Sequence, residues 1–507
     1  MAQSHSSSQY WLDVEVGKIL EMIPDGEIIV SSGISPSATY HIGHFPEILN
    51  AEALTWGLLK AGRQARHIHV VDNMDPLRKR YDFLSGEYEQ FVGQPICLVP
   101  NPYGEGSYAD HFFGEFSQYF DKLGIKPDKI VKSYEDLYCS GKMADQFDRV
   151  LNNLDEVKAI FAQFGREVAS DWTPIQVLND DGVFVNARPD TWDKKSKTIE
   201  GVDYTSGKAK LNWRLDWPAR WAVLGVDVEP FNVHEHGAAG GSYDTGVEFA
   251  RRIFNVKAPV PGARYGNIHL GDDPKKMSSS RGNLITPEEA LKIIPPSLLR
   301  YFVVRSRPQK PLHFHVGDKL INLVDEFKQV SSSQDSGREH EFSEAFNFAD
   351  IGDRLTDVPF SHLVAVYQAA LKDTGRTLEI LQRTGYDVDE AELEAELYYV
   401  ENWLQSHASE RVRFHLQQDI PDDSNLSQNQ SGFLSALADS IASQDELDAE
   451  WVHETIYSLK DEYGLTPSQA FQSVYWVLLG QNSGPKAGWF LATIDREWLL
   501  KRLKLEG

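Results

Sequence analysis

Two short motifs contain residue types suited to binding a polyphosphate, and the first of them is His41-Ile42-Gly43-His44. It follows the apolar run Ile28–Val30 and precedes apolar residues at helical spacing over positions 45–60. The motif therefore falls at a predicted strand–loop–helix junction, where unpaired backbone N–H groups and the helix dipole favour an anion. Two imidazoles three residues apart add hydrogen-bond donors, and Gly43 lets a ligand approach the backbone.

The second motif is Lys275-Lys276-Met277-Ser278-Ser279-Ser280, followed by Arg281. Small, polar and basic residues suit a loop that covers a polyphosphate. Lys276 would supply a compact positive charge where charge develops in a transition state. Each motif alone is moderate evidence, because a lone HxGH occurs by chance and a Lys-Ser run is more often a solvated loop. Together, in this order and ahead of a helical C-terminal third, they are strong evidence.

The two motifs resemble the HIGH and KMSKS signatures of the class I aminoacyl-tRNA synthetases. Further stretches narrow the resemblance to the class I lysyl-tRNA synthetase family, and they are Gly33–Ser37, Val71–Arg78, Leu211–Trp221, Gly240–Gly246 and Leu479–Leu491. The similarity runs from about residue 11 to about residue 505, which is nearly the whole chain. The loop departs from the family pattern at Ser278–Ser280, where a second lysine is missing and Arg281 is adjacent.

The resemblance implies a ligase that activates L-lysine with ATP, giving lysyl-adenylate, and transfers it to the 3′ end of tRNA(Lys). ATP enters as a substrate with Mg²⁺. The implied catalytic residues are His41, His44 and Lys276; the implied ATP-binding residues are Gly43, Gly240, Gly241, Lys275, Met277, Ser278, Ser279 and Ser280. Positions that resemble the family's lysine pocket are Gly33, Ser35, Asp72, Trp221, His236 and Tyr265, with Asp75 as an alternative to Asp72.

Other interpretations stay open at this point. Each aromatic residue taken alone suits core packing better than a pocket. Another class I synthetase, for glutamate or arginine, is the runner-up. An inactive paralogue, or one that serves an acceptor other than tRNA, is a third reading. His234 and His236 would place two rings on one face of a strand, as in metal sites, but no third or fourth ligand is apparent and we predict no metal site.

Composition narrows the class of protein. With 507 residues, two to four domains are expected. The net charge of −25 argues against nucleic acid unless basic residues cluster locally. Two cysteines, Cys97 and Cys139, fit a reducing cytoplasm and suggest buried small side chains. No apolar run approaches 18 residues and no secretory signal is present, so we expect a cytoplasmic protein, which we take to be a monomer.

Alternating strand and helix patterns predict a doubly wound α/β domain, and the resemblance implies a Rossmann-like (HUP-type) catalytic domain with a polar insertion, followed by an all-α C-terminal region. The expected parts are a disordered tail (1–9), the first catalytic half (10–170), an insertion (171–213), the second catalytic half (214–285), a helical connecting domain (286–350) and an α-helical anticodon-binding domain (351–507). The resemblance implies that the insertion contacts the acceptor end of tRNA. It contains no cysteine, so we predict no structural zinc. Trp403, Arg411 and Arg413 are possible anticodon contacts.

Local patterns predict several element boundaries. Helices are expected over 107–123, 143–164 and 243–254, and strands over 128–131, 226–231 and 265–270. The Ser-, Gln- and Glu-rich segment 331–347 is expected to be a linker or long loop, and 420–431 a flexible connector. Thr466-Pro467 is expected to begin a helix that ends at Gly480.

Overall fold

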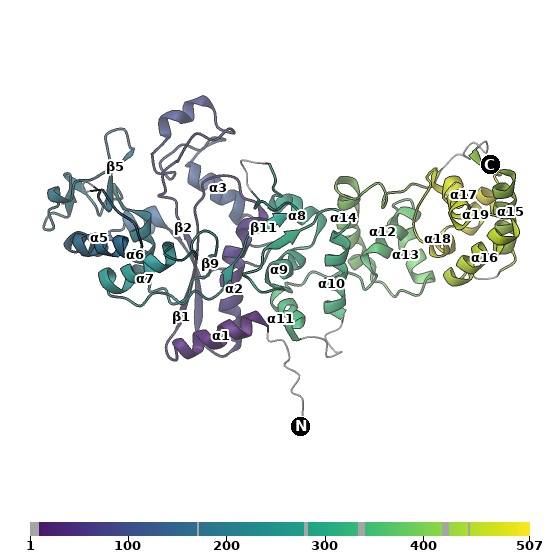
Figure 1. Cartoon of the computed structure of the whole chain (residues 1–507), viewed down its shortest axis with the longest axis horizontal. Helices are drawn as coiled ribbons and strands as arrows, with labels where there is room; N and C mark the ends of the chain where they lie inside the picture. Colours follow the sequence, from purple (N-terminus) through teal and green to yellow (C-terminus); the bar gives the residue numbers. More distant parts are fainter. Residues whose placement is uncertain are drawn as a thin grey trace, which may run out of the picture. The chain divides into compact units, whose positions relative to one another are not determined.

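A computed structural model describes residues 10–169, 172–277, 282–332, 340–417, 425–444 and 447–506. The predicted tail, residues 1–9, lies outside the described residues. The chain forms two compact units, whose elements are labelled in Figure 1. The first unit contains residues up to Leu291, Pro296–Phe314 and the segment ending at Ile351; the second contains Lys292–Pro295, the segment beginning at His315, and Gly352 onward. Segment 286–350 therefore contributes to both units.

The first unit is built on a parallel sheet. β1 (Ile28–Ile34) pairs with β2 (Ala65–Val71), which pairs with β3 (Lys129–Lys132), all parallel. On the other side of β1, Val228 bridges both Val30 and Val260, and beyond it β9 (Phe231–Asn232) pairs with β10 (Arg264–Tyr265). The strand order is thus β3-β2-β1-β9-β10, so the order reverses between β1 and β9. Ligands bind outside the carboxyl ends of the strands at such a switch point, and the predicted doubly wound fold is confirmed.

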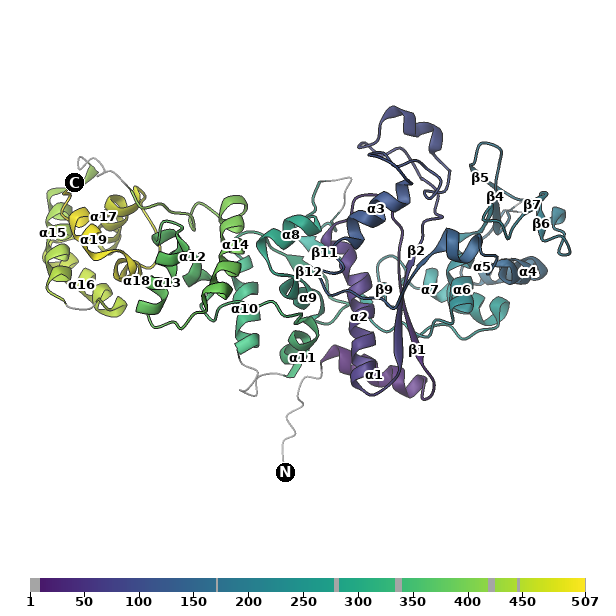
Figure 2. The ribbon, with the colours of Figure 1, turned by 180° about the vertical axis from the view of Figure 1, so that it is seen from behind.

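Helices cover both sides of this sheet (Figures 1 and 2). α2 (Phe45–Lys60) packs on β1 and β2, and α1 (Trp11–Met22) packs on α2, because both bury apolar stripes. The remaining helices of this unit are α3 (Tyr108–Ser117), α4 (Ala144–Asn152), α5 (Leu154–Gln163), α6 (Trp213–Leu224), α7 (Ser242–Phe249), α8 (Pro287–Ile293), α9 (Pro296–Val304) and α11 (His340–Ala349). A separate parallel pair joins β11 (Ile268–Leu270) to β12 (Leu312–Phe314).

The polar insertion forms its own small antiparallel sheet. β4 (Ile175–Leu178) pairs with β5 (Phe184–Asn186) on one edge and with β8 (Ala209–Leu211) on the other. β6 (Thr198–Ile199) and β7 (Val202–Asp203) form a hairpin. Figure 2 shows these strands beside α4 and α5, and they share an apolar core with those helices.

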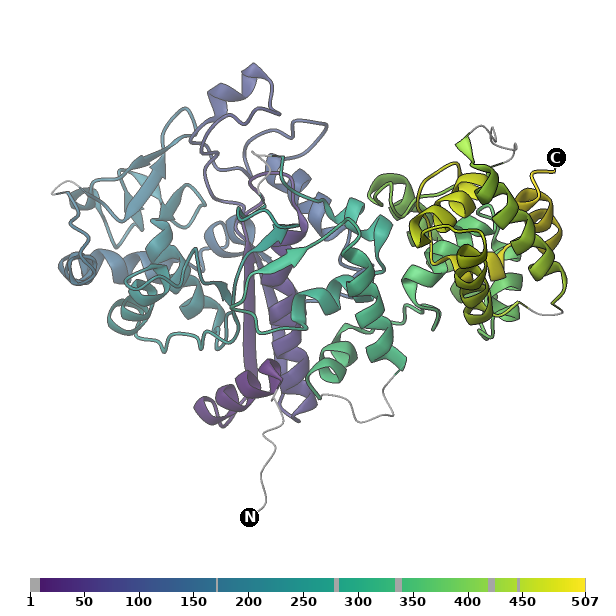
Figure 3. The same ribbon diagram turned by 45° about the vertical axis from the view of Figure 1, so that its right-hand side comes forward.

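Every regular element among the described residues of the second unit is a helix. These helices are α10 (Leu320–Ser332), α12 (Phe360–Ala369), α13 (Thr374–Arg383), α14 (Glu390–Ser406), α15 (Gln428–Ala442), α16 (Ala449–Glu462), α17 (Pro467–Leu479), α18 (Ala487–Thr493) and α19 (Arg496–Leu503). Figure 3 shows α15–α19, in yellow and yellow-green, gathered together, and their buried side chains form one apolar core. The predicted all-α C-terminal region is confirmed.

Several predicted boundaries are wrong. The helix expected over 107–123 ends at Ser117, and Asn153 divides the helix expected over 143–164. The strand expected over 265–270 is two strands, β10 and β11, and the helix expected over 243–254 becomes a π-turn after Phe249. His234 and His236 lie in turns after β9 rather than on a strand.

Part of each expected connector is helical among the described residues. Residues 331–332 end α10 and residues 340–347 belong to α11, whose Phe346 and Phe348 are buried; residues 333–339 lie outside the described residues. Within 420–431, α15 begins at Gln428, because Ser427 and Gln430 form a capping box. Residues 420–424 lie outside the described residues. The helix from Pro467 to Gly480 is as predicted, with Gly480 in the left-handed conformation at φ 66°.

Two expectations from composition concern membranes and cysteines. No helix among the described residues is long and apolar enough to cross a membrane. Both cysteines are free. Cys97 is partly buried, whereas Cys139 is exposed in the turn after residues 133–138, so the expectation that both are buried is wrong for Cys139.

Candidate active site

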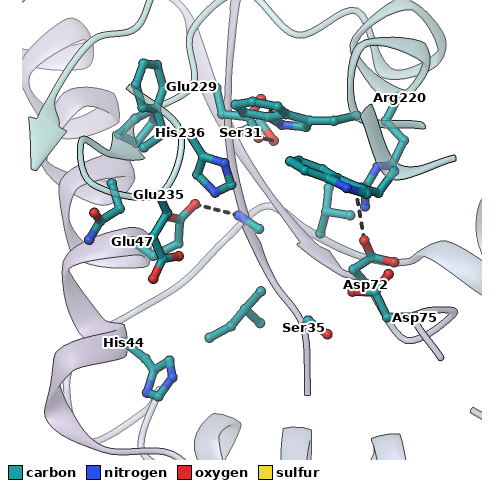
Figure 4. A pocket seen from close by; sticks show the side chains of 18 of the residues that line it. Ser31, Ser35, His44, Glu47, Asp72, Asp75, Arg220, Glu229, Glu235 and His236 are labelled. Atoms are coloured by element: carbon teal, nitrogen blue, oxygen red, sulfur yellow. Dashed lines mark hydrogen bonds and ion pairs between the residues drawn. The ribbon is translucent and has the colours of Figure 1, made fainter. Parts of the chain in front are cut away.

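One cavity of about 850 Å³ opens at the carboxyl ends of β1, β2, β9 and β10. Figure 4 shows His44 and Glu47 on one side of it and Asp72, Asp75 and Arg220 on the other. The residues predicted from sequence that line this cavity are Gly33, Ser35, His41, Gly43, His44, Asp72, Trp221, His236, Tyr265, Lys276 and Met277. Residues from distant parts of the sequence therefore meet at the switch point of the sheet.

Three predicted ATP-binding residues do not line the cavity. Lys275 is exposed, and Gly240 and Gly241 stand at the start of α7. A Cβ at Gly241 would lie 2.6 Å from the Ala238 carbonyl oxygen, so close backbone packing accounts for this glycine. Ser278, Ser279, Ser280 and Arg281 lie outside the described residues.

The His41–His44 motif forms a 3₁₀ turn directly before α2. The Gly43 N–H donates to His41 Nδ1 at 3.0 Å, and the two imidazole centroids are 4.1 Å apart. Because His41 Nδ1 accepts this hydrogen bond, the neutral ring has its proton on Nε2, where it is available to a ligand. A Cβ at Gly43 would lie 2.7 Å from the His41 ring, so this turn requires glycine.

Burial keeps both imidazoles neutral. It lowers the pKa of His41 to about 2, helped by His44 and Lys276, and the pKa of His44 to about 4. Lys276 provides the positive charge at this end of the cavity. Its ammonium lies 2.7 Å from Glu235 Oε1, and its side chain is 51% exposed. The motifs therefore supply neutral donors and one cation that is free to exchange its partner.

Acidic and aromatic residues also line the cavity, and the first carboxylate among them is Glu47, one turn along α2 from His44. Its Oε1 accepts the Gly33 N–H at 2.9 Å, and its Oε2 accepts the Tyr265 hydroxyl. Burial raises the pKa of Glu47 to about 8. No cation among the described residues forms an ion pair with it, so Glu47 suits a cationic ligand.

Glu229 is the second carboxylate without an ion pair among the described residues. It accepts hydrogen bonds from the indole N–H of Trp217 at 3.1 Å and of Trp221, and from the Ser31 hydroxyl at 3.4 Å. Burial raises its pKa. The aromatic residues that line the cavity around it are Trp213, Trp217, Trp221, Phe231, His236 and Tyr265. A carboxylate framed by ring faces is a suitable receptor for an alkyl ammonium.

The predicted lysine-binding carboxylate Asp72 already has partners. Arg220 lies 3.1 Å from Asp72 and 3.2 Å from Asp216, and the buried Lys210 lies 3.5 Å from Asp72 and 2.6 Å from Asp75. Burial opposes ionisation of Asp72, but Arg220 and Lys210 prevail and lower its pKa to about 2. The network neutralises Asp72, which leaves Glu47 and Glu229 as the carboxylates open to a cation.

Tyr138 stabilises this network, and replacing it by phenylalanine tests the contribution. Its hydroxyl donates to Asp216 and accepts the Leu211 N–H at 3.3 Å, all in buried surroundings. We expect Tyr138→Phe to lower the free energy of unfolding by about 1–3 kcal/mol, measured by urea titration, because it leaves buried polar groups unpaired. Tyr103→Phe, at a residue 61% exposed, is the matched control. Equal unfolding midpoints for both variants would contradict this account.

Sequence reasoning missed Glu47, Glu229, Glu235, Lys210, Arg220 and the indoles of Trp213 and Trp217 as residues of the cavity. Trp213, Trp217 and Arg220 lie inside the stretch 211–221 that carries part of the resemblance, so that stretch was the available signal. Among the described residues, no group of three or more His, Cys, Asp or Glu side chains is arranged to hold a metal ion.

Comparison with known proteins decides the family. The model of the family described as "tRNA synthetases class I (K)" matches residues 9–351, more than half of the chain. The chain belongs to the class I (K) tRNA synthetases. A second model, described as an anticodon binding domain, matches residues 409–505, within the helical second unit. This membership confirms the resemblance identified from the two motifs.

Curated members of this synthetase family are similar over almost their full length. The lysine–tRNA ligases of Methanosarcina barkeri and Archaeoglobus fulgidus are each 35% identical to the chain. The alignments cover 98% of this chain and 97% and 99% of those proteins. The lysine–tRNA ligase of Thermoplasma volcanium is 32% identical, over 98% of each chain.

Proposed function

We propose that this synthetase activates L-lysine with ATP and transfers the lysyl group to the 3′ end of tRNA(Lys). The relatives named above support it, since each is a lysine–tRNA ligase. The observation that carries the proposal is that one cavity joins two unlike sets of residues. His41, His44 and Lys276 are suited to phosphate, and Glu47 and Glu229 are suited to ammonium groups.

In the first proposed step, a lysine carboxylate oxygen attacks the α-phosphorus of ATP. The P–O bond to the acyl oxygen forms, and the bond to the bridging oxygen breaks, releasing pyrophosphate with the electron pair. No protein nucleophile is required, because alignment and neutralisation of developing charge lower the barrier. Nε2–H of His41 would donate to phosphate oxygens, and His44 would act beside it. Mg²⁺ arrives with ATP as part of the substrate, and we assign it no protein ligand.

Lys276 would move from Glu235 to the phosphates when ATP binds. The pair is half-exposed on both sides, so exchanging the partner costs little. Met277 and Ile268 line the same end of the cavity and would pack against adenine. In the second step, a ribose hydroxyl of tRNA attacks the acyl carbon and AMP leaves.

The charges of the cavity match the charges of lysine. The amino acid has two ammonium groups, and the cavity has two carboxylates without ion pairs among the described residues, the half-buried Glu47 and the buried Glu229. Trp221, His236 and Tyr265 would cover the apolar stem, as the sequence predicts. Glutamate lacks the second ammonium group, so it would leave one carboxylate unpaired.

Lysine binding should depend on pH through Glu47. Its pKa of about 8 means that the carboxyl group is mainly protonated at pH 6–7 without a ligand. An ammonium partner favours the ionised form, so binding expels a proton, and lysine affinity should rise by up to about 50-fold from pH 6 to pH 8 as the ionised fraction rises from about 1% to about 50%. Calorimetry in two buffers of different ionisation enthalpy measures the proton released. Glu47→Gln should release fewer protons than the wild type, and a pH-independent affinity of the wild type would contradict this assignment.

We also propose roles for the rest of the molecule. The range matched by the anticodon model supports anticodon reading by the second unit, within 351–507. Trp403 is fully buried and its indole donates to Val316, so it packs in the core, whereas Arg411 is exposed. Both substrate-binding regions belong to one chain, which suits a cytoplasmic enzyme acting in translation as a monomer.

The direct test is aminoacylation by the pure protein with ATP, Mg²⁺ and total tRNA, using each amino acid in turn. We expect lysine alone to be attached, and only to lysine-accepting tRNA. Attachment of glutamate or arginine would assign another synthetase specificity. Adenylate formation without charging would indicate an acceptor other than tRNA, and inactivity with every amino acid would indicate an inactive paralogue.

A further inference from the structure

An arm of the first unit carries basic and aromatic residues beside the cavity. The arm is residues 76–107, between β2 and α3, and Figure 2 shows it as blue loops and a short helix that project above α3. We define the arm edge as Arg78, Lys79, Arg80, Tyr81 and Phe83. The first three are consecutive exposed cations in a chain whose net charge is −25, and the rest of the arm carries the carboxylates Asp82, Glu87, Glu89 and Glu105.

The arm edge begins at the wall of the cavity. Arg78 lines the cavity, next to Asp75 and Pro76. Neither Arg78 nor Lys79 forms an ion pair with another described residue, whereas Arg80 is tied to the Leu84 carbonyl at 3.0 Å and lies 3.5 Å from Glu89. Two cations are therefore available to an anionic ligand that extends from the cavity.

Aromatic rings follow directly after these cations. Tyr81 and Phe83 are stacked with centroids 5.5 Å apart and planes 8° apart, and the Lys79 ammonium lies 5.3 Å from the Tyr81 ring centroid. Phe83 is 39% exposed, and its ring rests edge-on against Phe112 of α3, 5.7 Å away. An exposed ring fixed from behind, with cations beside it, is a stacking platform for unpaired bases.

The arm is held in place by backbone hydrogen bonds. Leu77 and Gln94 bond at 2.8 Å, Ile96 donates to Asp75 at 2.9 Å, and Cys97 donates to Asn73 at 2.9 Å. The Phe184 N–H of β5 donates to Gly93 at 3.1 Å, which attaches the insertion to the arm. A surface ordered before binding loses less conformational entropy when a ligand arrives.

We propose that the arm edge binds the unpaired 3′ end of tRNA and leads its terminal ribose into the cavity. Arg78 and Lys79 contact phosphates, and a base stacks on Phe83. A single strand fits this role because the ribose hydroxyl must reach the adenylate. This inference rests on the proposed function, and it moves the main acceptor contact from the insertion, where the sequence placed it, to the arm.

A thermodynamic cycle tests the inference by binding alone. Intact tRNA and tRNA lacking its unpaired 3′ nucleotides are titrated into wild type and into Arg78→Ala/Lys79→Ala. We expect truncation to weaken binding to the wild type by about 10- to 100-fold and to change binding to the variant by less than 2-fold. The variant should also reduce the slope of log affinity against log salt by about 1–1.5, because two phosphate contacts are lost.

Lys194→Ala/Lys195→Ala is the matched control, since it removes two exposed cations from the insertion. Phe83→Ala should weaken binding of intact tRNA by about 5- to 150-fold, and Phe83→Trp should restore it. Equal truncation effects in wild type and the Arg78/Lys79 variant, no truncation effect in wild type, or a larger effect of the insertion variant would each overturn the inference. Failure of the wild type to attach lysine to tRNA would overturn the proposed function. The binding measurements would still test the arm edge, because they do not depend on activity.

Discussion

Lys276→Ala is expected to lower kcat for lysyl-adenylate formation by about 10²–10³-fold, the usual effect of removing one group that neutralises charge in a transition state. The KM for lysine should change little, because Glu47 and Glu229 are intact. The measurement is lysine-dependent pyrophosphate exchange with tRNA present, supported by single-turnover transfer.

Lys275→Ala is the control for this substitution, because Lys275 has the same side chain at the next position and does not line the cavity. It should retain activity within about 10-fold, as expected for an exposed cation outside the cavity. A Lys276→Ala enzyme with more than a tenth of wild-type kcat would contradict the role given to Lys276.

Glu229→Gln is expected to raise the KM for lysine by about 10- to 150-fold, because a hydrogen bond to a charged group contributes about 1.5–3 kcal/mol. Glutamine has nearly the same shape and still accepts from the indoles of Trp217 and Trp221. The substitution therefore removes the charge while preserving the packing. The KM for ATP should stay within a factor of two.

Glu21→Gln on α1 is the control for general effects of losing one negative charge, since Glu21 is exposed and outside the cavity. Glu47→Gln distinguishes the two carboxylates, because it should also reduce the pH dependence described above. Equal increases in the KM for lysine and for ATP in Glu229→Gln would show that the substitution disturbs the whole cavity.

The phosphate-binding residues of the site were predictable from sequence, whereas Glu47 and Glu229 were not. The strand pattern before His41, Gly43 and His44 and the helix pattern after them are visible in the sequence. These neighbouring residues are enough to place the motif at a strand–helix junction. Glu229 accepts hydrogen bonds from indoles on α6 and from a serine on β1. Nothing local distinguishes it from the other acidic residues, because its burial depends on how the sheet is assembled.

For Asp72 the position was predictable from sequence, but its ion-pair partners were not. Its place at the end of β2 was predictable, and it does line the cavity. Its ion-pair partners are Lys210, on β8 of the insertion, and Arg220, on α6. Both lie far from Asp72 in the sequence and meet it at the end of β2. Composition also misled over 340–347, where polar residues suggested a loop but buried phenylalanines fix a helix against α9.

The central claim is that one cavity holds both ends of lysyl-adenylate. It is tested most directly by calorimetric binding of a stable sulfamoyl analogue of lysyl-adenylate and of its 2-aminoheptanoyl counterpart, which replaces only the ε-ammonium by a methyl group. We expect the lysyl compound to bind at least about 10³-fold more tightly, because a site built for a charged group rejects an analogue that lacks it. Equal affinities for the two compounds would contradict the account.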